Sequence, residues 1–323
     1  MIDVVAVTWA GAGAPAGDVN VVAKAIDSEV NADWKKFTTL YGDTKDRTVS
    51  FITGKVLTEP ISLTAKMACS GPAASEFLSS IRPEAYKRLG ISDYSKRYLV
   101  VIAPKAGCVW SGRAPLGNAK SVSGMLVLHD SASSYVITHE LGHSFNLAHT
   151  QTNGHVIMYS ERAVVTPGPV DCSAHWAVGG DYQLPFPQTP GATAENISVM
   201  YPYVDVNPTG WPSPTGEYQA TVSTAEDLAA ISSIYPAASL ASGTGTISGT
   251  ITYPFSSDQI IGVNVVARNI DNPFEDAITV MSGDWNDGVP TAEQGTGEYT
   301  MRGLTPGARY VVHVENIFSG GFP

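Results

Sequence analysis

The sequence predicts a large domain of mixed helices and strands, followed by a small all-β domain. Three observations support this. Apolar strands and amphipathic helices alternate through the first part of the chain. The stretch A-A-S-L-A-S-G-T-G (237–245) is small and polar, as linkers are. Beyond it, short runs of alternating polarity are separated by turn residues. We therefore expect domains over 1–236 and 245–323, joined by a linker at 237–244.

Each expected element of the larger domain has its own signal. Apolar runs predict four strands, of which 97–103 is central because it is apolar on both faces. Helices are expected from near Asp18, over 71–89 with an interruption at Pro83, and up to Pro236 from a Ser223/Glu226 capping box. The residues between 149 and about 222 read as one long irregular stretch. The other expected strands are 4–9, 48–54 and 123–129.

Bulk composition excludes two classes of partner. The chain has 323 residues, 43% of them hydrophobic, and a formal net charge of −11 without a basic stripe, which argues against nucleic acid. No apolar run reaches the length of a membrane span. Met1 leads directly into the first strand without a signal peptide, so we expect a mature or trimmed form of a secreted, monomeric protein. We also expect the natural chain to continue beyond Pro323.

The three cysteines, Cys69, Cys108 and Cys172, allow one disulfide within the chain. A Cys108–Cys172 pair is the expected one, and three buried free thiols are the alternative.

The run H-E-L-G-H-S-F-N-L-A-H places three histidines and a glutamate within eleven residues. His139 and His143 are four apart, so on a helix they project from one face and can hold one zinc ion. Glu140 lies where its carboxylate can take a proton from a zinc-bound water that attacks a carbonyl. The spacing fits the chemistry of peptide hydrolysis.

His149 follows His143 by six residues, so a straight helix would carry it away from the metal face. The chain must turn sharply between them, and Asn146 stands at that turn. Asparagine is the next best residue after glycine for a left-handed backbone. We therefore predict that Asn146 ends the helix and brings His149 back as the third ligand.

This layout resembles the metzincin zinc metallopeptidases, whose pattern is H-E-x-x-H-x-x-G-x-x-H, with Asn146 in the glycine position. The stretch N-I-S-V-M-Y-P-Y-V (196–204) looks like their methionine turn, with Met200 beneath the metal. H-V-I-M-Y-S around Met158 is a competing candidate. The V-M-Y-P motif and the later helix E-D-L-A-A-I-S-S-I-Y resemble the end of a matrix-metallopeptidase catalytic domain.

Upstream, Y-L-V-V-I-A-P-K-A-G-C-V-W-S-G-R-A-P-L-G resembles gametolysin-like metzincins. The resemblance covers residues 1 to about 236 and implies an α+β (α/β) domain with a mixed twisted sheet, a zinc-bearing helix and two lobes. G-R-A-P-L-G-N-A (112–119) would be the rim that pairs with an extended peptide. Tyr201 and Tyr203 are expected to line the substrate pocket and not to bind the metal.

The segments I-S-G-T-I-T-Y-P, G-V-N-V-V-A-R-N and G-E-Y-T-M-R-G-L-T-P-G-A-R-Y-V-V-H-V-E resemble the carboxypeptidase regulatory-like β-sandwich. Nothing in them is expected to be catalytic. Such a domain either binds a surface or polymer or acts as a spacer.

Together these features lead to the hypothesis of a secreted zinc metalloendopeptidase that hydrolyses peptide bonds of extracellular proteins. His139, His143 and His149 would bind one Zn²⁺, with Glu140 as general base and Met200 supporting the site. The alternative is an extracellular adhesion or matrix-binding protein with a weak or inactive metzincin-like domain. His155 and His175 are read as exposed loop residues. The acidic clusters at 271–276 and 284–287 are either Ca²⁺ ligands or solvated turns.

Overall fold

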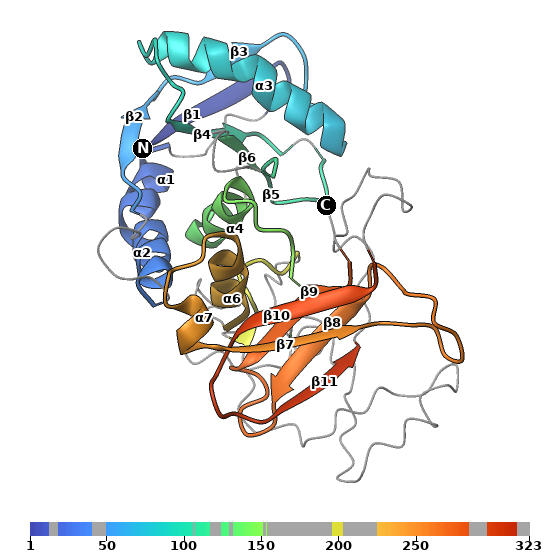
Figure 1. The fold of residues 1–323 in the computed structure, drawn as a ribbon. Coiled ribbons are helices and arrows are strands. Elements are labelled where there is room, and N and C mark those ends of the chain that lie inside the picture. The colour runs from blue at the N-terminus through green and yellow to red at the C-terminus, as the bar shows by residue number, and fades with distance from the viewer. Residues whose placement is uncertain are drawn as a thin grey trace, which may run out of the picture. The chain divides into compact units, whose positions relative to one another are not determined.

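The computed structural model describes residues 1–12, 19–40, 50–105, 107–116, 124–128, 132–150, 153, 196–202, 225–283 and 296–314. The chain divides into two compact units, the first ending at Ala148 and the second beginning at His149. Each unit is described by itself below. The ribbon in Figure 1 labels the elements of both.

A mixed sheet of six strands forms the centre of the first unit. Its order is β2-β1-β4-β6-β5, and β3 also pairs with β1. All pairings are parallel except that of β5 with β6, which is antiparallel. The strands are β1 (Ile2–Trp9), β2 (Thr53–Val56), β3 (Ile61–Leu63), β4 (Tyr98–Ala103), β5 (Gly112–Arg113) and β6 (Gly124–Leu128).

The expected central strand at 97–103 is β4, which lies between β1 and β6 with its apolar residues buried on both faces. The strand expected at 48–54 begins only at Thr53 within the described residues.

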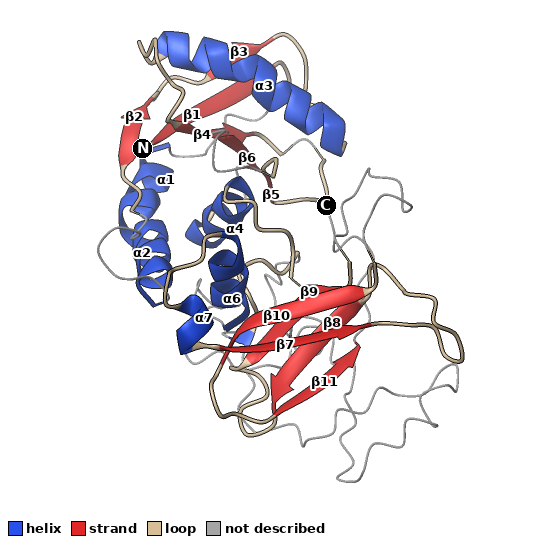
Figure 2. Cartoon of the chain, in the orientation of Figure 1, coloured by secondary structure: helices blue, strands red, loops and turns tan. Residues whose placement is uncertain are grey.

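Helices cover both faces of this sheet, as Figure 2 shows. Helix α3 (Gly71–Arg88) packs Leu78, Ile81 and Tyr86 into one core with Val5 and Val101. In a strand, successive side chains point to opposite faces, so the neighbours of Val5 and Val101 face the other side of the sheet. On that side, α4 (Ser134–Ser144) contacts β6. The sheet is therefore buried on both sides, as parallel sheets are.

The expected interruption of α3 at Pro83 is wrong, because the helix continues through it to Arg88. A proline inside a helix removes one hydrogen bond. Here the buried side chains on both sides of Pro83, Leu78 and Ile81 before it and Ala85 and Tyr86 after it, hold the helix on the sheet. Gly90 follows at φ 65°, in agreement with its expected role as the stop.

The first expected helix consists of three segments. They are α1 (Val19–Ala25), the π-helical turn η1 (Ile26–Val30) and α2 (Asn31–Leu40). Val22, Ile26, Val30 and Trp34, which recur every four residues, are all buried, as the apolar face of an amphipathic helix is. The π-turn gave no signal in the sequence.

One disulfide joins Cys69 to Cys108, with their Cα atoms 5.2 Å apart. The expected Cys108–Cys172 pair is therefore wrong, and Cys172 lies outside the described residues. The Trp110 indole N–H donates to the Cys69 carbonyl at 2.9 Å, which holds the two cysteine-bearing loops together. Residues 39 apart in sequence meet here through tertiary packing, which spacing alone does not reveal.

The described residues of the second unit form two antiparallel sheets and one principal helix. Strands β10 (Glu298–Leu304) and β7 (Gly245–Thr250) form one sheet, and the other has the order β11-β8-β9. We call these five strands the β module. The remaining strands are β8 (Asn264–Asn269), β9 (Ala277–Met281) and β11 (Tyr310–Val314).

Helix α6 (Ala225–Ile234) shares the hydrophobic core of the β module. Ala229 of α6 is buried together with Val265, Ile278 and Met301. The Thr279 hydroxyl of β9 also donates to the Glu226 carboxylate. The segment expected as a linker, 237–244, contains the short helix α7 (Leu240–Gly243). A domain boundary there stays a prediction. Among the described helices, none is long and apolar enough to cross a membrane.

Candidate metal centre

Helix α4 begins with a serine cap. Ser133 has an extended backbone, and its hydroxyl accepts the Val136 N–H at 3.3 Å. The helix then runs to Ser144. His139 and His143 are one turn apart on it, and both are nearly buried.

The helix ends at a left-handed residue, as predicted for Asn146. Its φ is 68°, one of three positive values outside glycine among the described residues. The Asn146 N–H donates to the His143 carbonyl, and the Leu147 N–H donates back to the Gly142 carbonyl at 3.0 Å. This pair of bonds is a Schellman motif, which reverses the chain direction after a helix.

The turn brings the third histidine to the other two. One ring nitrogen from each of His139, His143 and His149 lies within 4.8 Å of the others. In the described part of the chain, this is the one group of three or more possible metal ligands. The predicted bend at Asn146 is therefore present, and it brings the His149 ring to those of His139 and His143.

One hydrogen bond of the site fixes which ring nitrogen of His143 carries the proton. His143 Nδ1 lies 2.8 Å from the Leu147 carbonyl, which can only accept, so the proton belongs on Nδ1 and Nε2 keeps its lone pair. Burial also lowers the pKa of His143, which favours the neutral ring. The same turn that redirects the chain therefore sets the tautomer of His143.

The three residues fit a zinc ion. Three imidazoles from H-E-x-x-H and one later histidine leave a fourth tetrahedral position free, as in catalytic zinc sites. The burial of His139 and His143 excludes the reading of these residues as exposed surface histidines. The His139–His143–His149 cluster can thus hold a metal ion compatible with Zn²⁺.

Glu140 lies beside these ligands but belongs to a different local environment. Its side chain packs against the backbone of β5, so close that a Cβ on Gly112 would lie 2.6 Å from its Oε1. Burial raises the pKa of Glu140 to about 8, while Arg113 and the Ala114 N–H act in the opposite direction. A buried carboxyl with a perturbed pKa, next to candidate metal ligands, suits a group that exchanges protons.

Met200 lies in a tight, buried turn within the second unit. It is fully buried, as is Tyr201. The Met200 N–H donates to Ser198 Oγ at 3.1 Å, and its carbonyl accepts the Thr150 N–H at 3.0 Å. Because Thr150 directly follows His149, the turn is hydrogen-bonded to the segment that carries the third ligand. A supporting role for Met200 beneath the metal stays a prediction.

Several predicted positions lie outside the described residues or have ordinary partners. Outside them are Met158, His155, His175, Tyr203, the 284–287 cluster and residues 117–119 of the expected rim. In the other acidic cluster, Asp271 pairs with Arg309, and Asp276 accepts hydrogen bonds from Asn269 and Tyr310.

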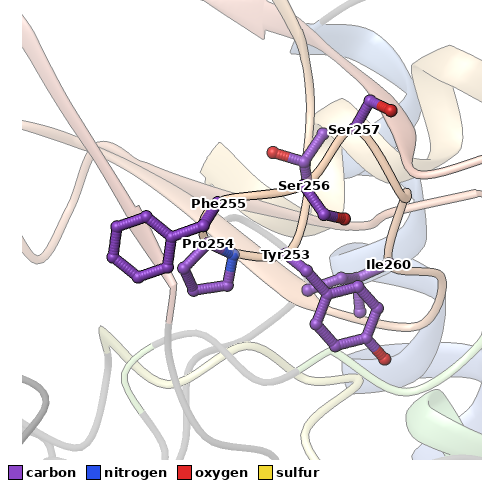
Figure 3. A pocket seen from close by; sticks show the side chains of 7 residues that line it. Tyr253, Pro254, Phe255, Ser256, Ser257 and Ile260 are labelled. Atoms are coloured by element: carbon purple, nitrogen blue, oxygen red, sulfur yellow. The ribbon is translucent and has the colours of Figure 1, made fainter.

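The β module has a hollow of its own, shown in Figure 3. Its volume is about 780 Å³, and Phe255 beside it is fully exposed with φ at 66°. Among the described residues, the lining holds no histidine and no carboxylate. It is lined by Thr252, Tyr253, Pro254, Phe255, Ser256, Ser257 and Ile260.

Comparison with known proteins gives limited information. No family model matches the chain, and no match is found among curated proteins. Solved structures with some similarity include wild-type OgpA from Akkermansia muciniphila. Its TM-score is 0.34 at 12% identity, over 94% of this chain and 81% of that one. A second crystal form gives 0.33 at 12% identity, over 97% and 92%.

Catalytically inactive OgpA in complex with an O-glycopeptide (glycodrosocin) substrate gives a TM-score of 0.32 at 12% identity, over 94% and 83%. Similarity at this level carries no argument about the activity of this chain, which must come from its own residues.

Proposed function

We propose that this chain is a secreted zinc-dependent endopeptidase of the metzincin type. One observation carries the proposal: His139, His143 and His149 converge next to the buried carboxyl of Glu140. This arrangement suits metal-assisted hydrolysis, because three imidazoles can hold an ion while a neighbouring carboxyl stays available as a base. A purely structural metal site would need no such base.

The roles of the residues follow from their positions. The three histidines would hold the ion, which when bound would supply Lewis acidity toward a water and a scissile carbonyl. Glu140 takes the proton of the attacking water and then delivers it to the leaving amine. The contact with Gly112 restricts where this carboxyl can move, which keeps it beside the ligands.

An extended peptide is the substrate that the neighbouring strand suits. Strand β5 is the last of the sheet order and pairs on one side with β6. Its other edge can accept an extended chain by β-augmentation. Since Gly112 of β5 contacts Glu140, a peptide bound there passes close to the base. This supports 112–119 as the rim of the substrate site.

Secretion is supported by the Cys69–Cys108 disulfide, because disulfides persist mainly in oxidising compartments outside the cytosol. We propose that the protein acts there as a monomer.

The test is Glu140→Gln, assayed on casein and gelatin beside the wild-type chain. Loss of a general base should reduce the rate by about 100-fold or more while one zinc per chain is retained. Glu84→Gln, at an exposed carboxylate paired with Arg88, is the matched control and should keep full activity. A chelator should abolish cleavage and added zinc restore it. Full activity of Glu140→Gln would refute the assignment.

The alternative is an adhesion or matrix-binding protein with an inactive centre. The exposed Tyr253 and Phe255 beside the hollow of Figure 3 are the observation that favours it. It predicts one zinc per chain, no cleavage by the wild-type protein, and binding to gelatin that Phe255→Ser weakens. Cleavage that depends on Glu140 would exclude this alternative.

A further inference from the structure

We infer that Arg268 of the β module is a positioning residue for the metal centre, acting through Asn153 on the segment that carries His149. This inference rests on the proposed function, because it takes His149 as a metal ligand. All of the contacts that support it lie within the second unit.

The segment after His149 is joined to the segment of Met200 at two points. The Thr150 N–H donates to the Met200 carbonyl at 3.0 Å, and Asn153 Nδ2 donates to the Asn196 carbonyl at 2.7 Å. The two bonds run in antiparallel order, since the later residue of one segment meets the earlier residue of the other. The chain beyond His149 is therefore held at one residue and at four residues from the ligand.

Asn153 is the centre of the second attachment. It is 2% exposed and has a left-handed backbone at φ 62°, which asparagine tolerates. Its Nδ2 uses one hydrogen for Asn196 and the other for the Phe274 carbonyl, also at 2.7 Å. Because both partners are acceptors, Oδ1 must face the remaining neighbour, which is Arg268.

Arg268 supplies the donor that this oxygen needs. It lies in β8, between β9 and β11, and is fully buried. Its Nη1 donates to Asn153 Oδ1 and, at 3.0 Å, to the Pro273 carbonyl. The guanidinium also lies 6.0 Å from the ring centre of Phe274. A buried arginine persists only where such partners compensate its charge.

The β module gives this arrangement a rigid base. Strand β8 pairs along its length with β9 and β11, and its Val265 and Ala267 lie in the core shared with α6. The position of Arg268 is thus fixed by two strand pairings and a packed core. Because Arg268 is bonded to Asn153, it also fixes the chain four residues after His149. The β module thereby holds the segment that follows His149.

The experiment measures zinc affinity in the full chain by competition with a metal-binding dye, and records the absorption spectrum of the Co²⁺ form. The variants are Arg268→Met and Asn153→Gly, which keeps the backbone freedom at φ 62° while it removes the amide. Arg302→Met is the matched control, because it removes an exposed arginine from the same module. Arg268→Lys tests partial rescue, since lysine keeps a charged donor.

Arg268→Met and Asn153→Gly should each weaken zinc binding by about 10-fold, the low end of what losing a direct partner of a metal ligand costs, because they act on His149 through the chain. Their Co²⁺ spectra should change, and the double variant should be no weaker than the worse single one. Arg268→Lys should recover part of the affinity, and Arg302→Met should match the wild-type chain. If Arg268→Met does not fold, Asn153→Gly and Arg268→Lys carry the same test.

Wild-type zinc affinity in folded Arg268→Met or Asn153→Gly would overturn the inference and leave the peptidase proposal intact. If zinc binding falls as expected but the wild-type chain cleaves no protein, the positioning role stands and the peptidase proposal fails. A wild-type chain that binds no zinc would overturn both.

Discussion

The carboxylate of Asp227 in α6 accepts the hydroxyl hydrogen of Ser198, two residues before Met200. Its second oxygen accepts the Val199 N–H at 3.1 Å. Ser198 in turn accepts the Met200 N–H, so one buried carboxylate shapes the whole turn. In the sequence, Asp227 stands out only as part of a helix pattern. The feature that could have revealed its role is an acidic residue at a helix position that faces the core, where a carboxylate needs hydrogen-bond partners.

Replacing Asp227 with asparagine should destabilise the second unit. The amide places an NH₂ group where one carboxylate oxygen stood, so either the Ser198 hydroxyl or the Val199 N–H loses its acceptor, and a buried donor left without an acceptor costs about 1–3 kcal/mol. Urea denaturation followed by fluorescence should show the lower midpoint. Asp258→Asn, at an exposed carboxylate of the same unit, should leave the midpoint unchanged. Equal midpoints for the two variants would show that the Asp227 bonds contribute nothing to stability.

The turn at Asn146 can be tested by its tolerance of glycine. Asn146→Gly should bind zinc as well as the wild-type chain, because glycine adopts φ 68° freely. Asn146→Ala should cost about 1–2 kcal/mol in the left-handed region, which corresponds to roughly tenfold weaker zinc binding if the turn relaxes. Dye competition at fixed pH measures both. Equal affinity in all three proteins would mean that the conformation of residue 146 does not control the third ligand.

Gly112 should be intolerant of any side chain. A methyl group there would lie 2.6 Å from Glu140 Oε1 and 2.7 Å from Val136 Cγ1, so the base must move. Gly112→Ala should lower kcat on casein by at least about tenfold, because misplacement of a catalytic group by about 1 Å can cost 100-fold. Gly243→Ala is the matched control, since nothing lies within 4 Å of the added methyl. An unchanged kcat in Gly112→Ala would show that the carboxyl has free space.

The Cys69–Cys108 disulfide should stabilise the fold by restricting the unfolded chain. Joining residues 39 apart restricts the unfolded chain, and its loss should cost about 2–4 kcal/mol. Cys69→Ser, Cys108→Ser and the double variant should unfold at the same lower urea concentration. Alkylation of the unreduced, denatured wild-type chain should label one thiol, and Cys172→Ser should abolish that label. Labelling of three thiols would contradict the pairing.

The metal cluster was predictable because its determinants are local. The i, i+4 spacing places His139 and His143 on one face, and the tolerance of Asn146 for a left-handed backbone returns His149 within three residues. The buried faces of the helices and the central strand β4 follow from apolar periodicity in the same way.

Pairings between distant residues were not predictable. The disulfide partner of Cys108 lies 39 residues upstream, and the positions of the three cysteines in the sequence are compatible with more than one pairing. The continuous path of α3 through Pro83 also depends on the sheet beneath it, since local propensity alone favours a break.

By itself, then, the sequence determined the candidate metal ligands, their helix and the turn that gathers them, because each depends on the backbone preferences of a few neighbouring residues. The tertiary structure alone decided the surroundings of those ligands: the close contact of Gly112 with Glu140, the hold of Asp227 on the methionine turn, and the link from Arg268 to Asn153. These contacts join residues 28 to 115 positions apart, and only the packing of the sheets and of α6 brings such residues together.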